Sequence, residues 1–238
     1  MKINLLALVI LTMFPLLAFS QSGTNVERAY ACSLNDGFSI SDAVSIMRSF
    51  NWDEDAAPRY VALNEGVYVS DTFRENWDFY LGFYYTSMSD LAEKRLAFRA
   101  RNGSSEGFIL RDVASCSSAP RLNGVDFVQG PAGGGDAPAF TAMISTNCDV
   151  NPEVSPIMAA QNIAAIMGEN LRNIQIITRQ FGGPSEMMGA TVGFRAVFDS
   201  PDGFSEAMDS LRLNPPGAAP ACRTPGAWLR YKIFDRED

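Results

Sequence analysis

The feature of this sequence that most constrains its fold is a short motif that occurs in both halves of the chain. The segment 78–86 reads Asp-Phe-Tyr-Leu-Gly-Phe-Tyr-Tyr-Thr, and the segment 189–198 reads Gly-Ala-Thr-Val-Gly-Phe-Arg-Ala-Val-Phe. Both contain an aliphatic residue followed by Gly-Phe, within a run of aromatic and β-branched residues typical of a strand. Self-similarity within a chain indicates a duplicated structural unit, so the two segments predict the same strand in two copies.

The predicted elements around the motif follow the same order in both halves. The first half contains a predicted strand, helix, strand, strand, helix and strand at 29–34, 39–50, 59–69, 77–86, 89–101 and 124–128, with an irregular stretch before the last strand. The second half contains the same series at 139–146, 153–168, 173–181, 190–198, 203–212 and 227–234. The sequence therefore predicts an α+β fold made of two tandem βαββαβ units with antiparallel sheets.

The N-terminal segment 1–20 has the pattern of a signal peptide. Lys2 precedes an apolar run that ends at Phe19, and Ala18-Phe19-Ser20 offers a small-x-small cleavage site. A membrane anchor is the competing interpretation, but the run is shorter than the roughly 20 residues that a spanning helix needs, and Pro15 interrupts it. We therefore expect cleavage and export to the periplasm or the extracellular space, with no stable membrane anchor.

The rest of the chain is predicted to form a first unit over 21–128, a linker over 129–138 and a second unit over 139–238. The linker reads Gln-Gly-Pro-Ala-Gly-Gly-Gly-Asp-Ala-Pro, a composition typical of a flexible connection. Its glycines are not followed by the Lys-Ser/Thr pair of a phosphate-binding loop, so the sequence indicates no nucleotide site there.

Composition excludes several classes of function. The chain has 27 acidic and 19 basic residues, a net charge of −8, and its basic residues are scattered, so we expect no nucleic-acid partner. It contains no histidine, which excludes a Ser-His-Asp triad, a Cys-His pair, histidine-ligated haem and the usual zinc and copper sites. The sequence accordingly predicts no catalytic residue, no cofactor and no metal site.

The four cysteines of an exported chain favour two disulfides. In a βαββαβ unit the first and last strands are antiparallel neighbours, so the end of the first strand lies near the start of the last. Cys32 falls late in a predicted first strand and Cys116 shortly before a predicted last strand, and Cys148 and Cys222 occupy corresponding places in the second half. We therefore predict the pairs Cys32–Cys116 and Cys148–Cys222.

With this order of elements, the two motifs Leu81-Gly82-Phe83 and Val192-Gly193-Phe194 and the placement of the cysteines, the chain resembles the ferredoxin-like dimeric α/β-barrel superfamily. In that superfamily two βαββαβ units pack their sheets face to face, and this chain would be a tandem fusion of both. The group includes cofactor-independent monooxygenases, haem-degrading enzymes, chlorite dismutase-like and dye-decolourising peroxidases, and exported proteins of unknown role. The haem-degrading members rely on a histidine that this chain lacks, so the resemblance implies the fold and leaves the function open.

Alternation along the strands indicates which side chains face the helices and which face the opposite sheet. The predicted helix-facing residues are Leu81, Phe83 and Tyr85 in the first half and Val192, Phe194, Ala196 and Phe198 in the second. The predicted ligand-binding residues, on the opposite side, are Tyr80, Tyr84, Gln175, Arg179 and Arg195. Arginines and tyrosines on one face suit a small organic or anionic ligand such as a carboxylate. The alternative is that the arginines pair with acidic residues such as Glu65 or lie at a solvated strand end.

Two other groups of residues allow further interpretations. Asn35, Asn64 and Trp77 are residue types that some oxygenases of the resembling superfamily use without a metal, although we favour a structural role at element ends and in the core. The acidic segment 53–55 could hold calcium, but it lacks the spacing and the glycine of an EF-hand loop. We interpret it as a solvated loop.

Three functions remain open from the sequence. We favour a non-catalytic exported protein that binds a small molecule, or an interaction partner, at a pocket between its two sheets. A cofactor-independent monooxygenase that acts on an electron-rich substrate is the second hypothesis. The third is a purely structural or oligomer-forming protein whose two sheets pack without a cavity.

Overall fold

The computed structural model describes residues 22–104, 106–133, 136, 138–149, 155–181, 191–213 and 222–236. The predicted signal peptide at 1–20 lies outside these residues. Within the described part of the chain, no helix has both the length and the apolar character needed to cross a membrane.

The helices and strands follow the predicted order, with three additions. The first half contains β1 (Ser22–Leu34), α1 (Ile40–Ser49), β2 (Tyr60–Tyr68), α2 (Asp71–Arg74), β3 (Phe79–Tyr85), α3 (Met88–Asn102), the 3-10 helix η1 (Glu106–Leu110), β4 (Ala114–Cys116) and β5 (Arg121–Gln129). The second half contains β6 (Phe140–Asp149), α4 (Pro156–Met167), β7 (Leu171–Phe181), β8 (Thr191–Phe198), α5 (Pro201–Leu213) and β9 (Gly226–Asp235). The elements α2, η1 and β4 were not predicted, and β1 begins well before the predicted strand.

Serine caps set the starts of two helices in the first half. The Ser39 hydroxyl accepts a hydrogen bond from the backbone N–H of Asp42, and the Asp42 carboxylate accepts one from the Ser39 N–H, which is a capping box. Ser87 caps α3 by accepting from the N–H of Asp90. The chain therefore turns into a helix soon after it leaves β1 and β3.

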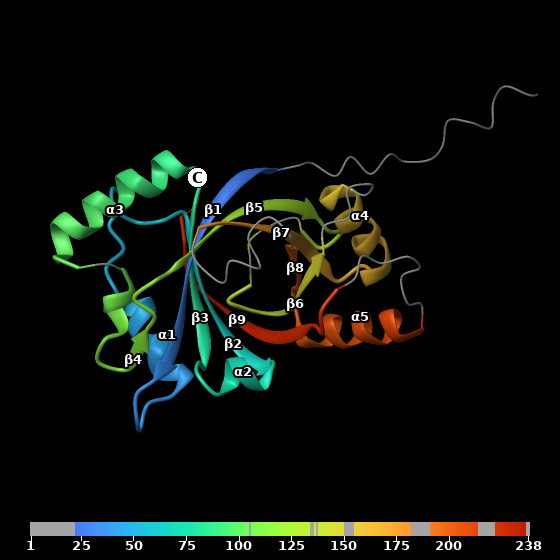
Figure 1. Ribbon diagram of the computed structural model, residues 1–238, viewed down its shortest axis with the longest axis horizontal. Coiled ribbons are helices and arrows are strands. Elements are labelled where there is room, and N and C mark those ends of the chain that lie inside the picture. Colours follow the sequence, from blue (N-terminus) through green and yellow to red (C-terminus); the bar gives the residue numbers. More distant parts are fainter. Residues whose placement is uncertain are drawn as a thin grey trace, which may run out of the picture.

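The strands form one closed barrel and not two separate sheets. Around the eight-stranded ring the order is β3-β2-β9-β6-β8-β7-β5-β1, and β1 also pairs with β3, which closes it. All of these pairs are antiparallel, and β4 is an extra strand on β1. The predicted face-to-face packing is therefore corrected in one respect: hydrogen bonds between β2 and β9 and between β5 and β7 join the two sheets at their edges (Figure 1).

Within the ring, each half of the chain contributes four consecutive strands in an equivalent order. The first half gives β5-β1-β3-β2, and the second half gives β9-β6-β8-β7. Helices α1 and α3 lie on the outside of the first half, and α4 and α5 lie on the outside of the second (Figure 1). The barrel interior is thus a space shared by residues from both halves.

Two hydrophobic cores lie between the barrel and its outer helices, one in each half. Leu81, Phe83 and Tyr85 belong to the first core, which also contains Met47 of α1. The second core contains residues of α4 and of the helix-facing, outer side of β8, namely Ala160, Ala164, Val192, Phe194, Ala196 and Phe198. The strand residues predicted to face the helices therefore do so in both halves.

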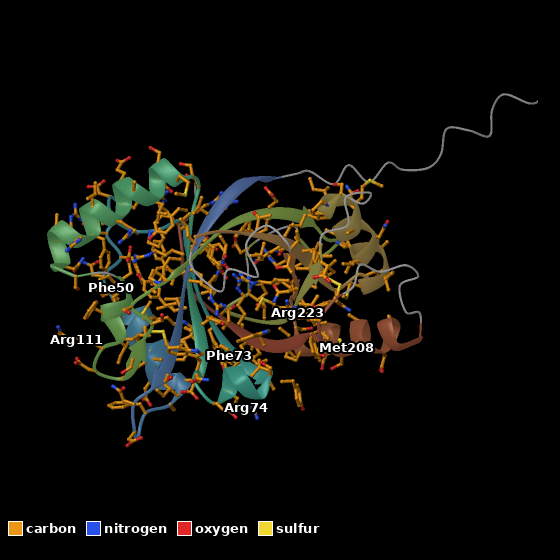
Figure 2. The ribbon with its side chains drawn as sticks, viewed as in Figure 1. Phe50, Phe73, Arg74, Arg111, Met208 and Arg223 are labelled. Carbon is orange, nitrogen blue, oxygen red and sulfur yellow. A yellow bond between two sulfur atoms is a disulfide. The ribbon has the colours of Figure 1, made fainter. Side chains whose placement is uncertain are left out.

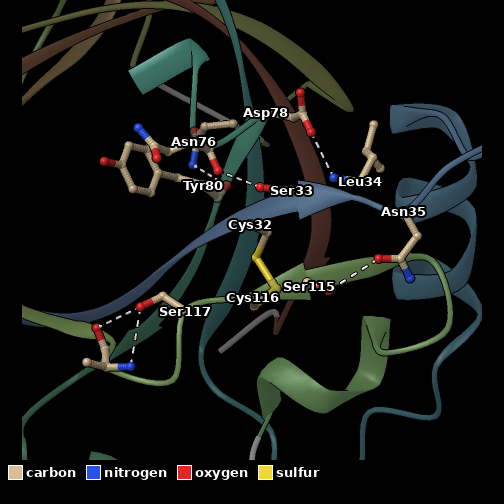
Figure 3. Close-up of a disulfide and its surroundings, with 12 residues drawn as sticks. Cys32, Ser33, Leu34, Asn35, Asn76, Asp78, Tyr80, Ser115, Cys116 and Ser117 are labelled. Carbon is tan, nitrogen blue, oxygen red and sulfur yellow. Dashed lines mark hydrogen bonds between the residues drawn. A yellow bond between two sulfur atoms is a disulfide. The ribbon is translucent and has the colours of Figure 1, made fainter. Parts of the chain in front are cut away.

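Both predicted disulfides are present among the described residues. The Cys32–Cys116 bridge connects β1 to β4, whose residues pair directly opposite each other (Figure 3). The Cys148–Cys222 bridge connects the end of β6 to the segment before β9, where the two residues form an isolated β-bridge. Each bridge closes a loop within one half of the chain.

The described part of the predicted linker is tied to the barrel. The N–H of Gly130 donates to the carbonyl of Arg172, and the N–H of Ala132 donates to the carbonyl of Leu171. A Cβ atom at Gly130 would lie 2.2 Å from the Leu171 carbonyl oxygen, so this close approach requires glycine. Residues 130–132 of the predicted linker therefore pack closely against β7.

Candidate functional site

A buried ion pair inside the barrel joins the two halves of the chain. Arg195 of β8 donates from Nη1 to Oε1 of Glu27 at 2.6 Å and from Nη2 to Oε2 at 3.0 Å. Glu27 lies on β1 and is 1% exposed, and the Arg195 side chain is 19% exposed. This bidentate arrangement of two charge-assisted hydrogen bonds is the strong form of an arginine–carboxylate pair.

Further polar side chains complete the surroundings of Glu27. The Tyr84 hydroxyl donates to Oε1 of Glu27 at 2.7 Å, and Nδ2 of Asn123 donates to Oε2 at 2.7 Å. The Tyr84 oxygen in turn accepts from Nη2 of Arg230 at 2.9 Å. Arg230 is 4% exposed, and its guanidinium lies 5.4 Å from the ring centre of Tyr60. The interior network therefore contains two guanidinium groups and one carboxylate.

The network shifts the pKa values of its members in opposite directions. Burial alone would raise the pKa of Glu27, but the charge of Arg195 and the hydrogen bonds from Arg195, Tyr84 and Asn123 outweigh it and lower the pKa to about 2. Burial raises the pKa of the Tyr84 hydroxyl well above its usual value, and the Glu27 charge adds to this. At neutral pH Glu27 is therefore a carboxylate and Tyr84 a neutral phenol.

The recurring glycine of the Gly-Phe motif makes room inside the barrel. A Cβ atom at Gly82 would lie 3.1 Å from Oε1 of Glu27, and one at Gly193 would lie 3.1 Å from Cβ of Ile177 and 3.2 Å from Oδ1 of Asn147. Both glycines are on the inward side of their strands. Their function is to accommodate inward side chains of neighbouring strands.

A pocket of about 710 Å³ opens into the barrel beside α2. Inward residues of the strands line it, together with the segment 67–74 around α2 and the segment 223–226 before β9. One wall is aromatic: the ring centroid of Phe73 lies 4.9 Å from that of Tyr80 and 5.1 Å from that of Trp228. Trp228 is held in place by a 2.7 Å hydrogen bond from Nε1 to the hydroxyl of Ser145.

The charged residues that line the pocket are all basic. Among the residues that the structure describes, its lining contains Arg74, Arg121, Arg195 and Arg223 and no aspartate or glutamate. Figure 2 labels Arg74 on α2 and Arg223 before β9. Arg195 is neutralised by Glu27, whereas the described residues offer no carboxylate partner to the other three arginines. The pocket therefore has positive charge to offer to a ligand.

Several buried polar atoms in and near the pocket have no hydrogen-bond partner within the described part of the chain. Oδ1 of Asn64, which lines the pocket, is one of them, while its Nδ2 atom donates to the Tyr80 carbonyl at 3.4 Å. The other such atoms among the described residues are Oδ1 of Asn123, Oδ1 of Asn173, Oε1 of Gln175 and Nε of Arg230. Buried polar atoms are normally satisfied, so these positions favour contact with water or a ligand.

The structure places the predicted ligand-binding residues in different surroundings. Tyr80 and Arg195 line the pocket, and Tyr84 belongs to the buried network next to it. Gln175 is buried opposite Arg195 on the neighbouring strand. The backbone of Arg179 pairs with that of Asn123, and its side chain lies outside the described residues.

The alternative prediction for Arg195 identified the right interaction with the wrong partner. Arg195 does pair with an acidic residue, but this residue is Glu27 and not Glu65. The carboxylate of Glu65 instead accepts from the hydroxyl of Tyr231 at 2.8 Å. Glu27 was missed because it precedes the predicted first strand, whereas β1 begins at Ser22 and residues 26–29 are all buried.

Of the residues considered for an oxygenase site, Asn64 alone lines the pocket. Asn35 and Trp77 are not part of its lining, and Oδ1 of Asn35 accepts a hydrogen bond from Ser115 at 3.2 Å near the Cys32–Cys116 bridge (Figure 3). The acidic segment 53–55 is tied to α3, because Arg101 forms salt bridges with both of its aspartates. The aspartates considered as calcium ligands thus have a cationic partner, and the segment is exposed, as expected of a solvated loop.

Comparisons with known proteins support the fold. No protein-family model and no curated protein matches the sequence. Among solved structures, a candidate monooxygenase from Fusobacterium nucleatum aligns with a TM-score of 0.52 and 12% identity, over 89% of this chain and 94% of that one. A candidate monooxygenase from Lactobacillus acidophilus aligns with a TM-score of 0.51 and 7% identity, over 89% and 95%. At such identities the likeness shows that the chain shares the α/β-barrel fold of these proteins and nothing about its reaction.

Proposed function

We propose that this chain is an exported protein that binds a small organic molecule in the pocket beside α2. The observation that carries the proposal is the pocket itself: an opening of about 710 Å³ with an aromatic wall and an unpartnered buried amide oxygen on Asn64. Pockets of this size that combine apolar walls with a few directed polar groups are typical small-molecule sites. A purely structural barrel has no need of such an opening.

In this proposal the chain is also a tandem duplication that is exported from the cytoplasm. The matching strand orders of the two halves support two tandem copies of one ferredoxin-like unit. The apolar segment at 1–20, together with two disulfides, supports export into an oxidising compartment. A pocket that opens outside the cytoplasm would collect its ligand from the surroundings of the cell.

A ligand screen with a blocked variant tests the proposal. Asn147 lines the pocket, so Asn147→Trp should fill part of it, and Glu93→Trp on the exposed side of α3 is the matched control. The purified mature chain is titrated calorimetrically with a panel of small aromatic, aliphatic, acidic and neutral compounds. We expect at least one compound to bind the wild type and the control with equal affinity and to bind Asn147→Trp at least tenfold more weakly. Failure of every compound to bind would contradict the proposal.

Arg195→Ala is a poor test of this site. Removal of the Arg195 guanidinium leaves the Glu27 carboxylate buried and unpaired, which destabilises the protein whether or not a ligand binds there. Loss of binding in that variant would therefore report on folding. Variants of the rim and of the aromatic wall avoid this problem because they leave the Glu27 network intact.

A cofactor-independent monooxygenase is the second candidate function. One observation favours it: the amide oxygen of Asn64, which has no hydrogen-bond partner among the described residues, lies in a pocket with Tyr80 and Trp228, where it could accept a hydrogen bond from the hydroxyl of a phenolic or quinol substrate and orient it. Since the chain has no histidine and no free cysteine, its residues do not fit a histidine- or thiolate-ligated haem. Oxygen uptake, measured across aromatic and quinol substrates, tests this candidate, and uniform absence of uptake would eliminate it.

A further inference from the structure

From the charges and rings that line the pocket, we infer that its ligand is an aromatic carboxylate, with the ring against Phe73, Tyr80 and Trp228 and the carboxylate at Arg121. This inference rests on the proposed small-molecule function and names the chemical class of the ligand. It follows from three observations: the sign of the charge, the availability of one guanidinium, and the position of that guanidinium relative to the aromatic wall.

The sign of the charge in the pocket is opposite to that of the whole chain. The chain has a net charge of −8, yet the described residues that line the pocket include four arginines and no carboxylate. A concave site lined by one sign of charge concentrates ligands of the other sign and repels like-charged ones. Because the basic pocket lies in an otherwise acidic protein, it favours the binding of an anion at this position.

Arg121 is the pocket arginine best prepared to hold that anion. Arg195 is already neutralised by the two-pronged pair with Glu27, and Arg74 and Arg223 are exposed at the rim. Arg121 is half-buried, and its Nη1 atom donates to the Tyr80 hydroxyl at 2.8 Å. A guanidinium has five N–H donors, and the contact with Tyr80 uses one of them. Two neighbouring N–H groups therefore remain to bind both oxygens of a carboxylate.

The aromatic wall lies directly beside this guanidinium. The centre of the Arg121 guanidinium is 5.2 Å from the Tyr80 ring centroid, and the Tyr80 centroid is 5.4 Å from that of Trp228. A flat ring that packs on Phe73 and Trp228 would thus have its substituent within the reach of Arg121. An aromatic wall of this kind binds an aromatic ring more strongly than a saturated ring of the same size.

Three matched probes test both parts of the inference. Benzoate supplies a ring and a charge, benzamide supplies the ring without the charge, and cyclohexanecarboxylate supplies the charge without an aromatic ring. Calorimetric titration of the mature wild-type chain gives a dissociation constant for each. We expect benzoate to bind about tenfold or more tightly than benzamide and about threefold or more tightly than cyclohexanecarboxylate.

Two variants assign these preferences to residues. Arg121→Met should weaken benzoate at least about tenfold and benzamide less than about threefold, and Arg99→Met on exposed α3 is the matched control that should change neither. Phe73→Leu should weaken benzoate and benzamide alike and leave cyclohexanecarboxylate unchanged. Because Phe73 and Arg121 are on different elements, α2 and β5, a folding defect in one variant leaves the other as a test.

The possible failures are distinguishable. Equal binding of benzoate and benzamide, or an Arg121→Met variant that binds benzoate as tightly as the wild type, would overturn the inference while small-molecule binding stands. The inference also fails if none of the three probes binds but the wider panel yields another ligand that Asn147→Trp excludes. If the panel also yields nothing, the proposed function fails with it.

Discussion

Glu27 connects side chains from three different strands inside the barrel. Its carboxylate accepts hydrogen bonds from Tyr84 of β3, Asn123 of β5 and Arg195 of β8. Because Glu27 is 1% exposed, loss of its cation partner would leave a charge in a medium of low dielectric constant. The arrangement of the interior therefore depends on charge balance as well as on shape.

We expect Arg195→Met to lower the free energy of unfolding by about 3–5 kcal/mol, because the Glu27 carboxylate would remain buried without its cation. The double variant Glu27→Leu with Arg195→Met should recover most of this loss, since it removes both charges. Chemical denaturation at pH 7 measures both. A double variant as unstable as Arg195→Met alone would show that the pair matters for reasons other than its charge.

The lowered pKa of Glu27 predicts a specific loss of stability in acid. Its pKa is about 2 in the folded chain against an ordinary value of 4.5, so its contribution to stability is complete above pH 4.5 and disappears as the pH falls toward 2. This contribution is roughly 3 kcal/mol. We expect the free energy of unfolding of the wild type to exceed that of Glu27→Gln at pH 6, and this difference to shrink as the pH is lowered to 2.5. Chemical denaturation at a series of pH values measures it. A constant difference would contradict the assignment, and Glu93→Gln is the exposed control.

Alternation was enough to place some of these residues but not to pair them. Tyr80 and Arg195 were predicted on the inward side from the spacing around Gly82 and Gly193, and both line the pocket. The partner of Arg195 was not predictable, because a glutamate in the middle of a strand resembles a solvent-facing residue until the closed barrel provides its partners. Arg121, like Glu27, was also missed because it precedes a predicted strand, in this case the last strand of the first half.

At the scale of elements, the order within each half followed from the sequence, and the joining of the halves did not. The inward and outward faces of β3 and β8 were predictable from the alignment of their Gly-Phe motifs, because β8 alternates between half-buried and buried residues over most of its length, whereas β3 is buried on both faces. The pairing of β2 with β9 and of β5 with β7 depends on edge hydrogen bonds that any exposed strand could make. Nothing in the side-chain pattern separates a closed barrel from two stacked sheets.

The disulfides are the covalent constraints at this scale, and we expect each to stabilise its own half. The bridges join residues separated by 84 and 74 positions, so loss of either should cost about 4.5 kcal/mol in the chain-entropy description. Paired serine variants, Cys32→Ser with Cys116→Ser and Cys148→Ser with Cys222→Ser, are compared by thermal and chemical denaturation. If either paired serine variant is as stable as the wild type, the corresponding loop of the unfolded chain must already have little conformational freedom without its disulfide.

At the scale of the whole molecule, the barrel makes the two halves mutually dependent. A separate first half would leave the outer edges of β2 and β5 unpaired, and a separate second half would leave those of β7 and β9 unpaired. Open edges of this kind recruit other strands and promote association. The intact chain has no such edges around its ring.

We expect that fragments 21–128 and 139–238 do not form stable monomers when produced separately, and that they assemble one to one when mixed. Size-exclusion chromatography with light scattering gives the stoichiometry, and far-UV circular dichroism gives the folded content. The intact chain, as the control, should unfold in a single transition at every wavelength. A folded, monomeric fragment 21–128 would contradict the interdependence inferred from the closed ring.

Tyr84 and Arg195 occupy matching places, each two residues after the glycine of its strand, and both contact Glu27. A symmetric assembly of two identical first halves would put a tyrosine where Arg195 stands, and each Glu27 would then face a neutral partner. The ion pair therefore exists only because the two sides differ. The centre of the molecule therefore requires two unlike halves, and a single polypeptide supplies them in a fixed one-to-one ratio; exchange of one half for a copy of the other would remove the counter-ion of Glu27.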